Sequence, residues 1–203
     1  MNNKQLIFIH IPKTAGVSVA CTLKSNNILL DKQGKGTPRK YGFVHIFARD
    51  VIKEEDRHYP TVAVVRNPFN RIYSIFEFYQ KKRTDIPKTI NFEQFVLSFR
   101  TKFLNKDHQF TDCFEYVCGH NKQDIIVTDI LKFETLEEDF NALAHKYEFF
   151  AKLESHNANE LKKVDVDRTT LFTEEMKKEV EDIFSRDLKH FNYSYEQFLK
   201  GSL

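Results

Sequence analysis

A short turn that carries a lysine, two hydroxyls and a glycine is the part of the chain best suited to chemistry. It follows the apolar run Leu6–Ile11, and its polar and small residues are Lys13, Thr14, Gly16 and Ser18. A strand, a turn and a helix in this order would aim backbone N–H groups, an ammonium and hydroxyls at one point. The positive end of the helix adds to the attraction for an anion. The sequence therefore predicts an anion-binding loop.

This loop departs from the usual nucleoside-triphosphate-binding pattern. That pattern, G-x-x-x-x-G-K-(S/T), places glycines before and beside the lysine. Here the first glycine is Gly16, which comes after Lys13 and Thr14 rather than before them. We interpret the segment as an altered phosphate loop.

A second candidate site is a strand–helix junction that contains an arginine. The apolar run Thr61–Arg66 is typical of a buried strand, and Asn67 and Pro68 favour a helix N-cap and a first helical residue. The amphipathic helix that follows is predicted to turn Ser74 toward Arg66. Because ligands of open α/β sheets bind at the carboxyl ends of the strands, Arg66 and Ser74 are candidate binding residues.

Together the two motifs resemble those of sulfotransferases that use 3′-phosphoadenosine 5′-phosphosulfate (PAPS), in particular the branch with carbohydrate and heparan-type enzymes. In that family a P-K-T-(A/G)-(G/S)-(T/V)-(S/T) loop holds the 5′-phosphosulfate. The matching residues here are Lys13, Thr14, Ala15, Gly16, Val17 and Ser18. An R-(N/D)-P-x-x-R-x-x-S segment binds the 3′-phosphate, which implies Arg66 and Ser74, with Arg71 as a structural partner. Later similarity covers nearly the whole chain, through Phe110–Gly119, Ile125–Phe140 and Phe172–Tyr193.

The resemblance implies an α/β fold of three layers, α/β/α, with a central parallel sheet like that of P-loop NTPases and a helical C-terminal part. Residues 1–203 are expected to form a single sulfotransferase domain. The implied reaction moves the sulfuryl group of PAPS in line to an acceptor hydroxyl, with a carbohydrate as the favoured acceptor, and leaves PAP. Lys13 would stabilise the leaving phosphate. No metal is required, since a sulfuryl group carries less negative charge than a phosphoryl group.

Eight histidines compete for the role of the base that removes the acceptor proton. The resemblance favours His45, because family members carry a histidine at the start of the helix that precedes the second strand. An imidazole titrates near neutral pH and suits this role. The alternative is that His45 is a capping or core residue. His10 is expected to pack or hydrogen-bond beneath the site, and His108 is a weaker candidate at the acceptor site.

Two other classes of function stay open at this point. A small-molecule or nucleotide kinase would use the same type of loop, but it would need the missing glycines and an acidic residue at a strand end for magnesium. The candidate is Asp129, after the apolar run Ile125–Thr128. A non-catalytic nucleotide-binding module would keep the fold without the chemistry. The presence in one chain of Lys13, His45, Arg66 and Ser74 argues against it.

The apolar patterns predict the elements that position these residues. Strands are predicted at Leu6–Ile11, Thr61–Arg66 and Ile125–Thr128, with further short strands near Asn27–Leu30 and Phe149–Leu153. Helices are predicted at Gly16–Lys24, Ile46–Ile52, Pro68–Lys82, Phe92–Leu104, Thr111–Cys118, Leu136–Tyr147, Thr173–Phe184 and Tyr195–Lys200. The segments Asp31–Tyr41 and Lys82–Asn91 are predicted loops that could shape the acceptor site.

Composition fits a compact enzyme. The chain has 203 residues, 41% of them hydrophobic, and a net charge of +2, from which no nucleic-acid role follows. Basic clusters at Lys32, Lys35, Arg39 and Lys40 and at Lys81, Lys82 and Arg83 would either flank a cleft for an anionic acceptor or form solvated faces. Three cysteines are too few for a disulfide framework, so Cys113 and Cys118 are expected to be core residues in a reducing compartment.

No signal peptide is recognised, and no run of eighteen apolar residues predicts a membrane span. Animal members of the family are typically Golgi proteins with a membrane anchor. The chain is therefore expected either to work in a cytoplasm, with a bacterial one favoured, or to be a trimmed form of a Golgi-type protein. The sequence leaves the identity of the acceptor and the oligomeric state open.

Overall fold

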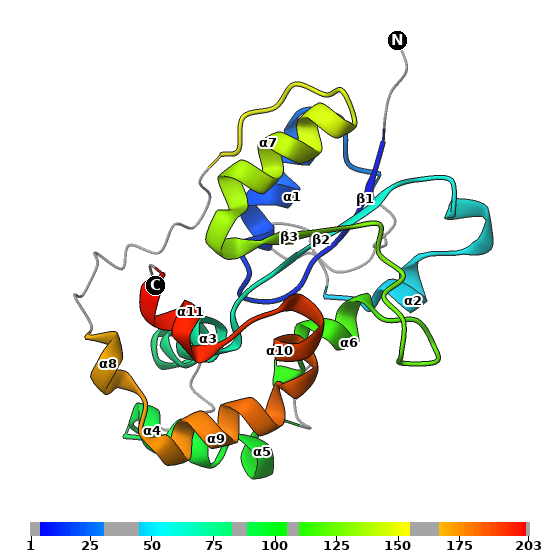
Figure 1. Cartoon of the computed structure of the whole chain (residues 1–203). Coiled ribbons are helices and arrows are strands. Elements are labelled where there is room, and N and C mark those ends of the chain that lie inside the picture. Colours follow the sequence, from blue (N-terminus) through cyan, green and yellow to red (C-terminus); the bar gives the residue numbers. More distant parts are fainter. Residues whose placement is uncertain (1–4, 31–44, 83–88, 105–109, 155–166, 202–203) are drawn as a thin grey trace. The chain divides into compact units, whose positions relative to one another are not determined.

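The computed structural model describes residues 5–30, 45–82, 89–104, 110–154 and 167–201 (Figure 1). The chain divides into two compact units. The first comprises Met1–Val65 and Cys113–Leu161, and the second comprises Arg66–Asp112 and Lys162–Leu203. Each unit has its own hydrophobic core and is described by itself. The expectation of a single domain over the whole chain stays a prediction.

A three-stranded parallel sheet forms the centre of the first unit. Its strands are β1 (Ile7–Ile9), β2 (Thr61–Val65) and β3 (Asp129–Lys132), in the order β1-β2-β3. All residues of β1 and β2 are buried, as expected for a parallel sheet whose two faces are both covered. The mixed α/β class with a central parallel sheet is therefore confirmed.

Helices lie on both sides of this sheet (Figure 1). Helices α1 (Gly16–Ser25) and α7 (Leu136–Lys146) pack on one face, where their apolar side chains share a core with β1, β2 and β3. The short helices α2 (Ala48–Val51) and α6 (Cys113–Val117) lie on the other side and contact each other. The turn between β1 and α1 therefore lies at the edge of the sheet where the parallel strands end.

The second unit is helical and has an aromatic core. Its elements are α3 (Pro68–Lys82), α4 (Phe92–Leu97), α5 (Phe99–Lys102), α8 (Arg168–Leu171), α9 (Glu174–Ile183), α10 (Ser185–Phe191) and α11 (Tyr195–Lys200). Phe69, Phe95, Phe99, Phe184 and Phe198 are fully buried there. Many of the twenty phenylalanines thus serve packing, which is the default role for such residues.

Local signals in the sequence placed most of these elements correctly. Helices α3 and α11 have the predicted bounds, and α1, α7 and α9 differ from prediction by only one or two residues at their ends. The predicted N-cap of α3 is confirmed, because Oδ1 of Asn67 accepts a hydrogen bond of 3.0 Å from the backbone N–H of Phe69. The helix predicted at Ile46–Ile52 is shorter, since α2 has only four residues.

The predicted strand Ile125–Thr128 is wrong, because β3 begins at Asp129. Ile125 instead forms an antiparallel bridge to Cys118 that closes a turn. Thr128 hydrogen-bonds through its side chain to the backbone N–H of Thr61, at 3.2 Å. The apolar run therefore forms part of a local turn. The parallel pairing with β2 starts only at the residues that follow this run.

Other predicted elements also need correction. Asn27–Leu30 provides a single bridge, between Leu6 and Leu29, and Phe149–Leu153 is irregular. The helix predicted at Phe92–Leu104 is two helices, because Ser98 ends α4 and its hydroxyl turns back to the Gln94 carbonyl at 2.6 Å. The helix predicted at Thr111–Cys118 is reduced to α6. The sequence missed α8 and α10, whose short apolar patterns are weak signals.

Several predictions fall outside the described residues. These are the loop Asp31–Tyr41 with its basic cluster at Lys32, Lys35, Arg39 and Lys40, most of the loop Lys82–Asn91 with Arg83, and the alternative base His108. In the part of the chain that the structure describes, no helix is long and apolar enough to cross a membrane.

The core of the first unit can be tested with two phenylalanines, one within α7 and one in the segment that follows it. Phe140 is completely buried, whereas Phe150 is 99% exposed. We expect Phe140→Ala to lower the free energy of unfolding by about 3–5 kcal/mol, because it removes a large buried side chain and leaves a cavity. Phe150→Ala is the matched control and should change it by no more than about 0.5 kcal/mol. Equal effects in urea denaturation would contradict the packing described here.

Candidate functional site

The predicted phosphate loop is a strained turn between β1 and α1. Lys13 and Ala15 adopt left-handed backbone conformations, with φ of 66° and 62°, although neither is a glycine. Such conformations cost about 1–2 kcal/mol for residues with a side chain and tend to occur at functional sites. Turns that include left-handed residues can direct successive backbone N–H groups toward one point and bind anions there. The strain therefore fits an anion-binding role for the loop.

Thr14 stabilises this loop through a buried hydrogen bond within it. Its side chain is fully buried, and its hydroxyl donates a hydrogen bond of 2.9 Å to the backbone carbonyl of Ile11. The hydroxyl proton is thus used within the loop. The contribution of Thr14 to an anion site must then come from its backbone N–H or from a rearranged side chain.

The start of α1 is electrostatically suited to a negative ligand. Its first turn contains no acidic residue. The backbone N–H of Ser18 bonds to the carbonyl of Ala15 at 3.0 Å, and the side chain of Ser18 is buried beside the turn. The N–H groups of Gly16 and Val17 belong to the first turn, where helix geometry provides no acceptor within the helix. Lys13 lies on this turn and is half-buried.

His10 follows β1 and packs directly against the start of α1. A side-chain carbon added to Gly16 would lie 2.1 Å from Cδ2 and 2.6 Å from Nε2 of His10. The His10 side chain is buried, and burial, with a smaller contribution from the neighbouring His45, lowers its pKa to about 3. His10 is therefore an uncharged structural ring at neutral pH. The expectation that it packs beneath the loop is confirmed.

His45 is brought to the same place from a distant part of the sequence. Its Nδ1 lies 3.2 Å from the backbone carbonyl oxygen of His10, and the centroids of the two imidazole rings are 4.6 Å apart. His45 is half-buried and precedes α2 by three residues. The structure therefore places the predicted base next to the ring that contacts the phosphate loop.

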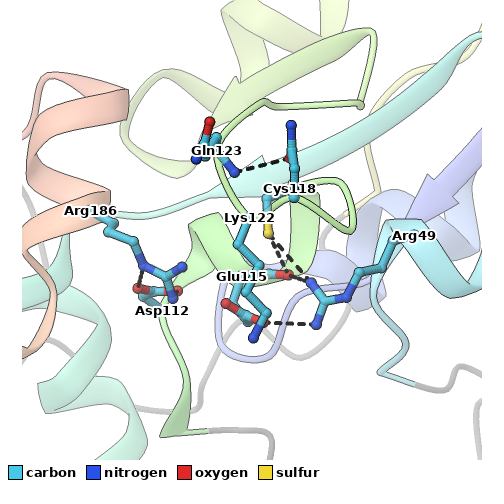
Figure 2. A network of polar contacts seen from close by, with 8 residues as sticks. Arg49, Asp112, Glu115, Cys118, Lys122, Gln123 and Arg186 are labelled. Atoms are coloured by element: carbon cyan, nitrogen blue, oxygen red, sulfur yellow. Dashed lines mark hydrogen bonds and ion pairs between the residues drawn. The ribbon is translucent and has the colours of Figure 1, made fainter.

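An ion pair that the sequence analysis missed anchors the helix that follows His45. In Figure 2 the guanidinium of Arg49, on α2, reaches Glu115 on α6 with Nη2 2.7 Å from Oε1. Nη1 of Arg49 also donates to the backbone carbonyl of Glu115 at 2.8 Å. Both side chains are only about one-tenth exposed, and Lys122 approaches the same carboxylate at 3.2 Å. The available signal in the sequence was Arg49 itself, which lies one helical turn after His45 and follows three apolar residues.

The predicted 3′-phosphate residues belong to the second unit. Arg66 directly follows β2, and Ser74 lies on α3; both side chains are 8% exposed. Asn67 fixes the start of α3 with its cap and also donates from Nδ2 to the backbone carbonyl of Ser194 at 3.0 Å. The first turn of α3 is therefore held from two directions.

The structural role predicted for Arg71 is confirmed. Its side chain is completely buried, and Nη1 donates to the backbone carbonyl of Thr111 at 2.7 Å. The neighbouring residue Asp112 accepts two hydrogen bonds from Arg186 on α10, at 2.8 and 3.0 Å (Figure 2). These arginines tie the segment before Cys113 to α3 and α10, respectively.

The magnesium ligand suggested for a kinase is in the wrong place. Asp129 is the first residue of β3 and pairs with Val62 near the start of β2, so it lies toward the amino end of the sheet. The loop at Lys13 follows the carboxyl end of β1 in the same parallel sheet. Asp129 is also bound by Lys146 and by the hydroxyl of Tyr147. The prediction that it ends a strand is therefore wrong.

No three His, Cys, Asp or Glu side chains among the described residues converge in a way that could hold a metal ion. Cys113 is the first residue of α6, Cys118 directly follows the helix, and both side chains are buried. The prediction that they are core cysteines is therefore confirmed.

The contact between His10 and Gly16 leads to a prediction about stability. Gly16→Ala should lower the free energy of unfolding by about 1–3 kcal/mol, because the new methyl group overlaps a buried ring that has little room to move. In a His10→Ala background the same substitution should cost much less, since the obstacle is gone and alanine favours a helix. Chemical denaturation of the four proteins of this cycle measures the coupling, and equal costs in both backgrounds would contradict it.

Comparisons with known proteins agree with the geometry of the loop. A model of the sulfotransferase family matches residues 2–194. No curated protein and no solved structure matches the chain. The family match spans β1, the phosphate loop, the β2–α3 junction and the C-terminal helices up to α10, so it includes Lys13, His45, Arg66 and Ser74 but not α11. The chain therefore belongs to the sulfotransferase family.

Proposed function

We propose that the protein transfers the sulfuryl group of PAPS to a hydroxyl group of a carbohydrate acceptor. The observation that carries this proposal is the strained loop of Lys13 and Ala15 at the start of α1, with His45 held next to it through His10. Family membership supports sulfuryl transfer in general. The donor nucleotide, the acceptor and the roles of individual residues are our inference.

Each end of PAPS has a proposed binding segment. The loop residues bind the 5′-phosphosulfate: Lys13, Thr14, Ala15, Gly16, Val17 and Ser18. Arg66 and Ser74 bind the 3′-phosphate. Support for the loop comes from its lysine, its left-handed residues and a helix start without acidic side chains. Support for Arg66 and Ser74 comes from their positions just before and within α3, whose start Asn67 caps, and from the resemblance of their motif to that of the family.

The proposed chemistry is an in-line displacement at sulfur. The acceptor oxygen attacks the sulfur atom while its proton moves to a ring nitrogen of His45. The bond between sulfur and the bridging oxygen of the 5′-phosphate breaks, and that oxygen keeps the electron pair as PAP leaves. Lys13 stabilises the negative charge that develops on the bridging oxygen. The products are the sulfated acceptor, PAP and a proton, which His45 then releases to solvent.

The position of Asp129 argues against the alternative that the protein is a kinase. Magnesium-dependent phosphoryl transfer needs a carboxylate near the phosphates. Asp129 lies toward the other end of the sheet and is already paired with Lys146. A sulfuryl group carries less negative charge than a phosphoryl group, so fixed positive charge from Lys13 and the backbone N–H groups suffices in our proposal. We therefore propose that no metal is required.

Ligand-dependent thermal unfolding tests the proposed donor. PAP and PAPS should raise the midpoint of unfolding, because a ligand that binds only the folded state stabilises it by mass action, whereas ATP and GTP should have little effect. Transfer of label from PAPS to a panel of neutral and uronic-acid oligosaccharides should then identify an acceptor, and EDTA should leave the rate nearly unchanged. Stabilisation by ATP with magnesium-dependent turnover would support a kinase instead.

Arg66→Ala tests the 3′-phosphate site. We expect this variant to bind PAP much more weakly, because a charge-assisted contact to the 3′-phosphate is lost. Its affinity for adenosine 5′-phosphosulfate, which lacks that phosphate, should change little. Calorimetry with both ligands measures the difference. Arg57→Ala is the control, since that side chain is 72% exposed and pairs with the nearby Glu54. Equal losses for both ligands would contradict the assignment of Arg66.

His45→Ala tests the proposed base. General-base catalysis typically contributes about 10² to 10⁴ in rate, so transfer to the best acceptor should fall by that factor. Affinity for PAP should stay within a few-fold of the wild-type value, because His45 is proposed to act on the acceptor. The acidic limb of the pH–rate profile should also disappear, since it reports protonation of the base. A variant with near-normal transfer would leave His45 as a structural residue.

A further inference from the structure

We propose that His10 is the positioning residue for the general base. Its backbone carbonyl fixes which nitrogen of His45 carries the proton, and its ring fixes the orientation of His45 relative to the phosphate loop. This inference rests on the proposed function, in which His45 is the general base. Nothing in the sequence motif alone separates this role from simple packing beneath the loop.

The first step concerns the proton on His45. Its Nδ1 lies 3.2 Å from the backbone carbonyl oxygen of His10, and a carbonyl oxygen can only accept a hydrogen bond. Nδ1 must therefore carry a hydrogen atom to form this contact. In a neutral imidazole the lone pair that accepts a proton then lies on Nε2. The carbonyl of His10 thus leaves Nε2 as the basic atom.

The second step concerns the orientation of the ring. The imidazole of His10 packs against the start of α1. It fills the space that a side chain at position 16 would occupy. It also lies against the imidazole of His45, with ring centroids 4.6 Å apart and an interplanar angle of 55°. Since His10 is buried and directly follows the fully buried strand β1, it has little freedom to move. His45 is therefore oriented by the same ring that contacts the start of α1.

The charge state of His10 suits this arrangement. Burial keeps His10 uncharged at neutral pH, as its lowered pKa indicates. When His45 accepts the acceptor proton at Nε2, it becomes an imidazolium next to a neutral ring rather than next to a second cation. Its Nδ1–H can still donate to the carbonyl of His10, and hydrogen bonds of charged donors are stronger than those of neutral ones. His10 therefore stabilises His45 after proton transfer as well as before it.

Nitrogen NMR of the wild-type protein labelled at its histidine rings tests the first step without any substitution. At a pH where His45 is neutral, we expect its Nδ1 to be protonated and its Nε2 to be unprotonated, both without ligand and with PAP bound. The His45→Ala variant identifies the resonances, because only they disappear. A ring with its proton on Nε2 would overturn the proposal, whatever the activity assays show.

A double-mutant cycle tests the second step, with transfer from PAPS to the best oligosaccharide of the panel as the readout. We expect His10→Ala to lower kcat by about 10-fold to 100-fold, which is the scale of misplacing a catalytic group. In the His45→Ala background, His10→Ala should change kcat by no more than about twofold, because residues that act as a unit are strongly non-additive. Fully additive effects would overturn the positioning role.

The controls separate this proposal from its alternatives. Ile9→Val alters the neighbouring buried residue of β1 and should leave kcat unchanged, which checks for a general effect of weakened packing. If His10→Ala does not fold, His10→Asn replaces it, because asparagine keeps a polar side chain with less loss of volume. A wild-type rate in His45→Ala would overturn the proposed base itself. If His45→Ala has a low rate and His10→Ala lowers the rate by the same factor with and without His45, only the role of His10 would be overturned.

Discussion

The close approach of the His10 imidazole to the start of α1 is the constraint on which the phosphate-loop region depends. A ring this near to Gly16 excludes any side chain at that position, so the glycine of the loop is required by packing. The same ring meets His45, whose Nδ1 reaches the backbone carbonyl of His10. One buried, uncharged side chain thus connects the proposed anion-binding turn to the candidate base.

The loop differs from glycine-rich phosphate loops in how it obtains its shape. Lys13 and Ala15 hold left-handed conformations that glycine would adopt without strain. The cost is offset by the surrounding structure, which includes the hydrogen bond from Thr14 to Ile11 and the fully buried β1 strand. A loop held in this way already has its shape before a ligand binds. Such preorganisation reduces the loss of conformational entropy on binding.

Buried charges have a similar ordering role in the rest of the molecule. Arg49 and Glu115 pair with little exposure, and the carboxylate is shared with Lys122. Such a pair adds little net stability compared with apolar residues, but losing one partner leaves a buried charge uncompensated. Its effect is therefore to fix α2, and with it the segment that carries His45, against α6. In the second unit Arg71 fixes α3 by bonding to the carbonyl of Thr111.

The sequence by itself determined the local features of this protein. The strand–turn–helix at Lys13, the capped start of α3 at Asn67 and the bounds of α3 and α11 follow from residues close together in the chain, where propensity and capping decide the outcome. Only the tertiary structure decided the position of β3, because the apolar run at Ile125 was as well suited to a turn as to a strand. It also decided the contacts of His10 with His45 and of Arg49 with Glu115, which join residues 35 and 66 positions apart. Such contacts depend on how the elements pack, and no local pattern encodes them.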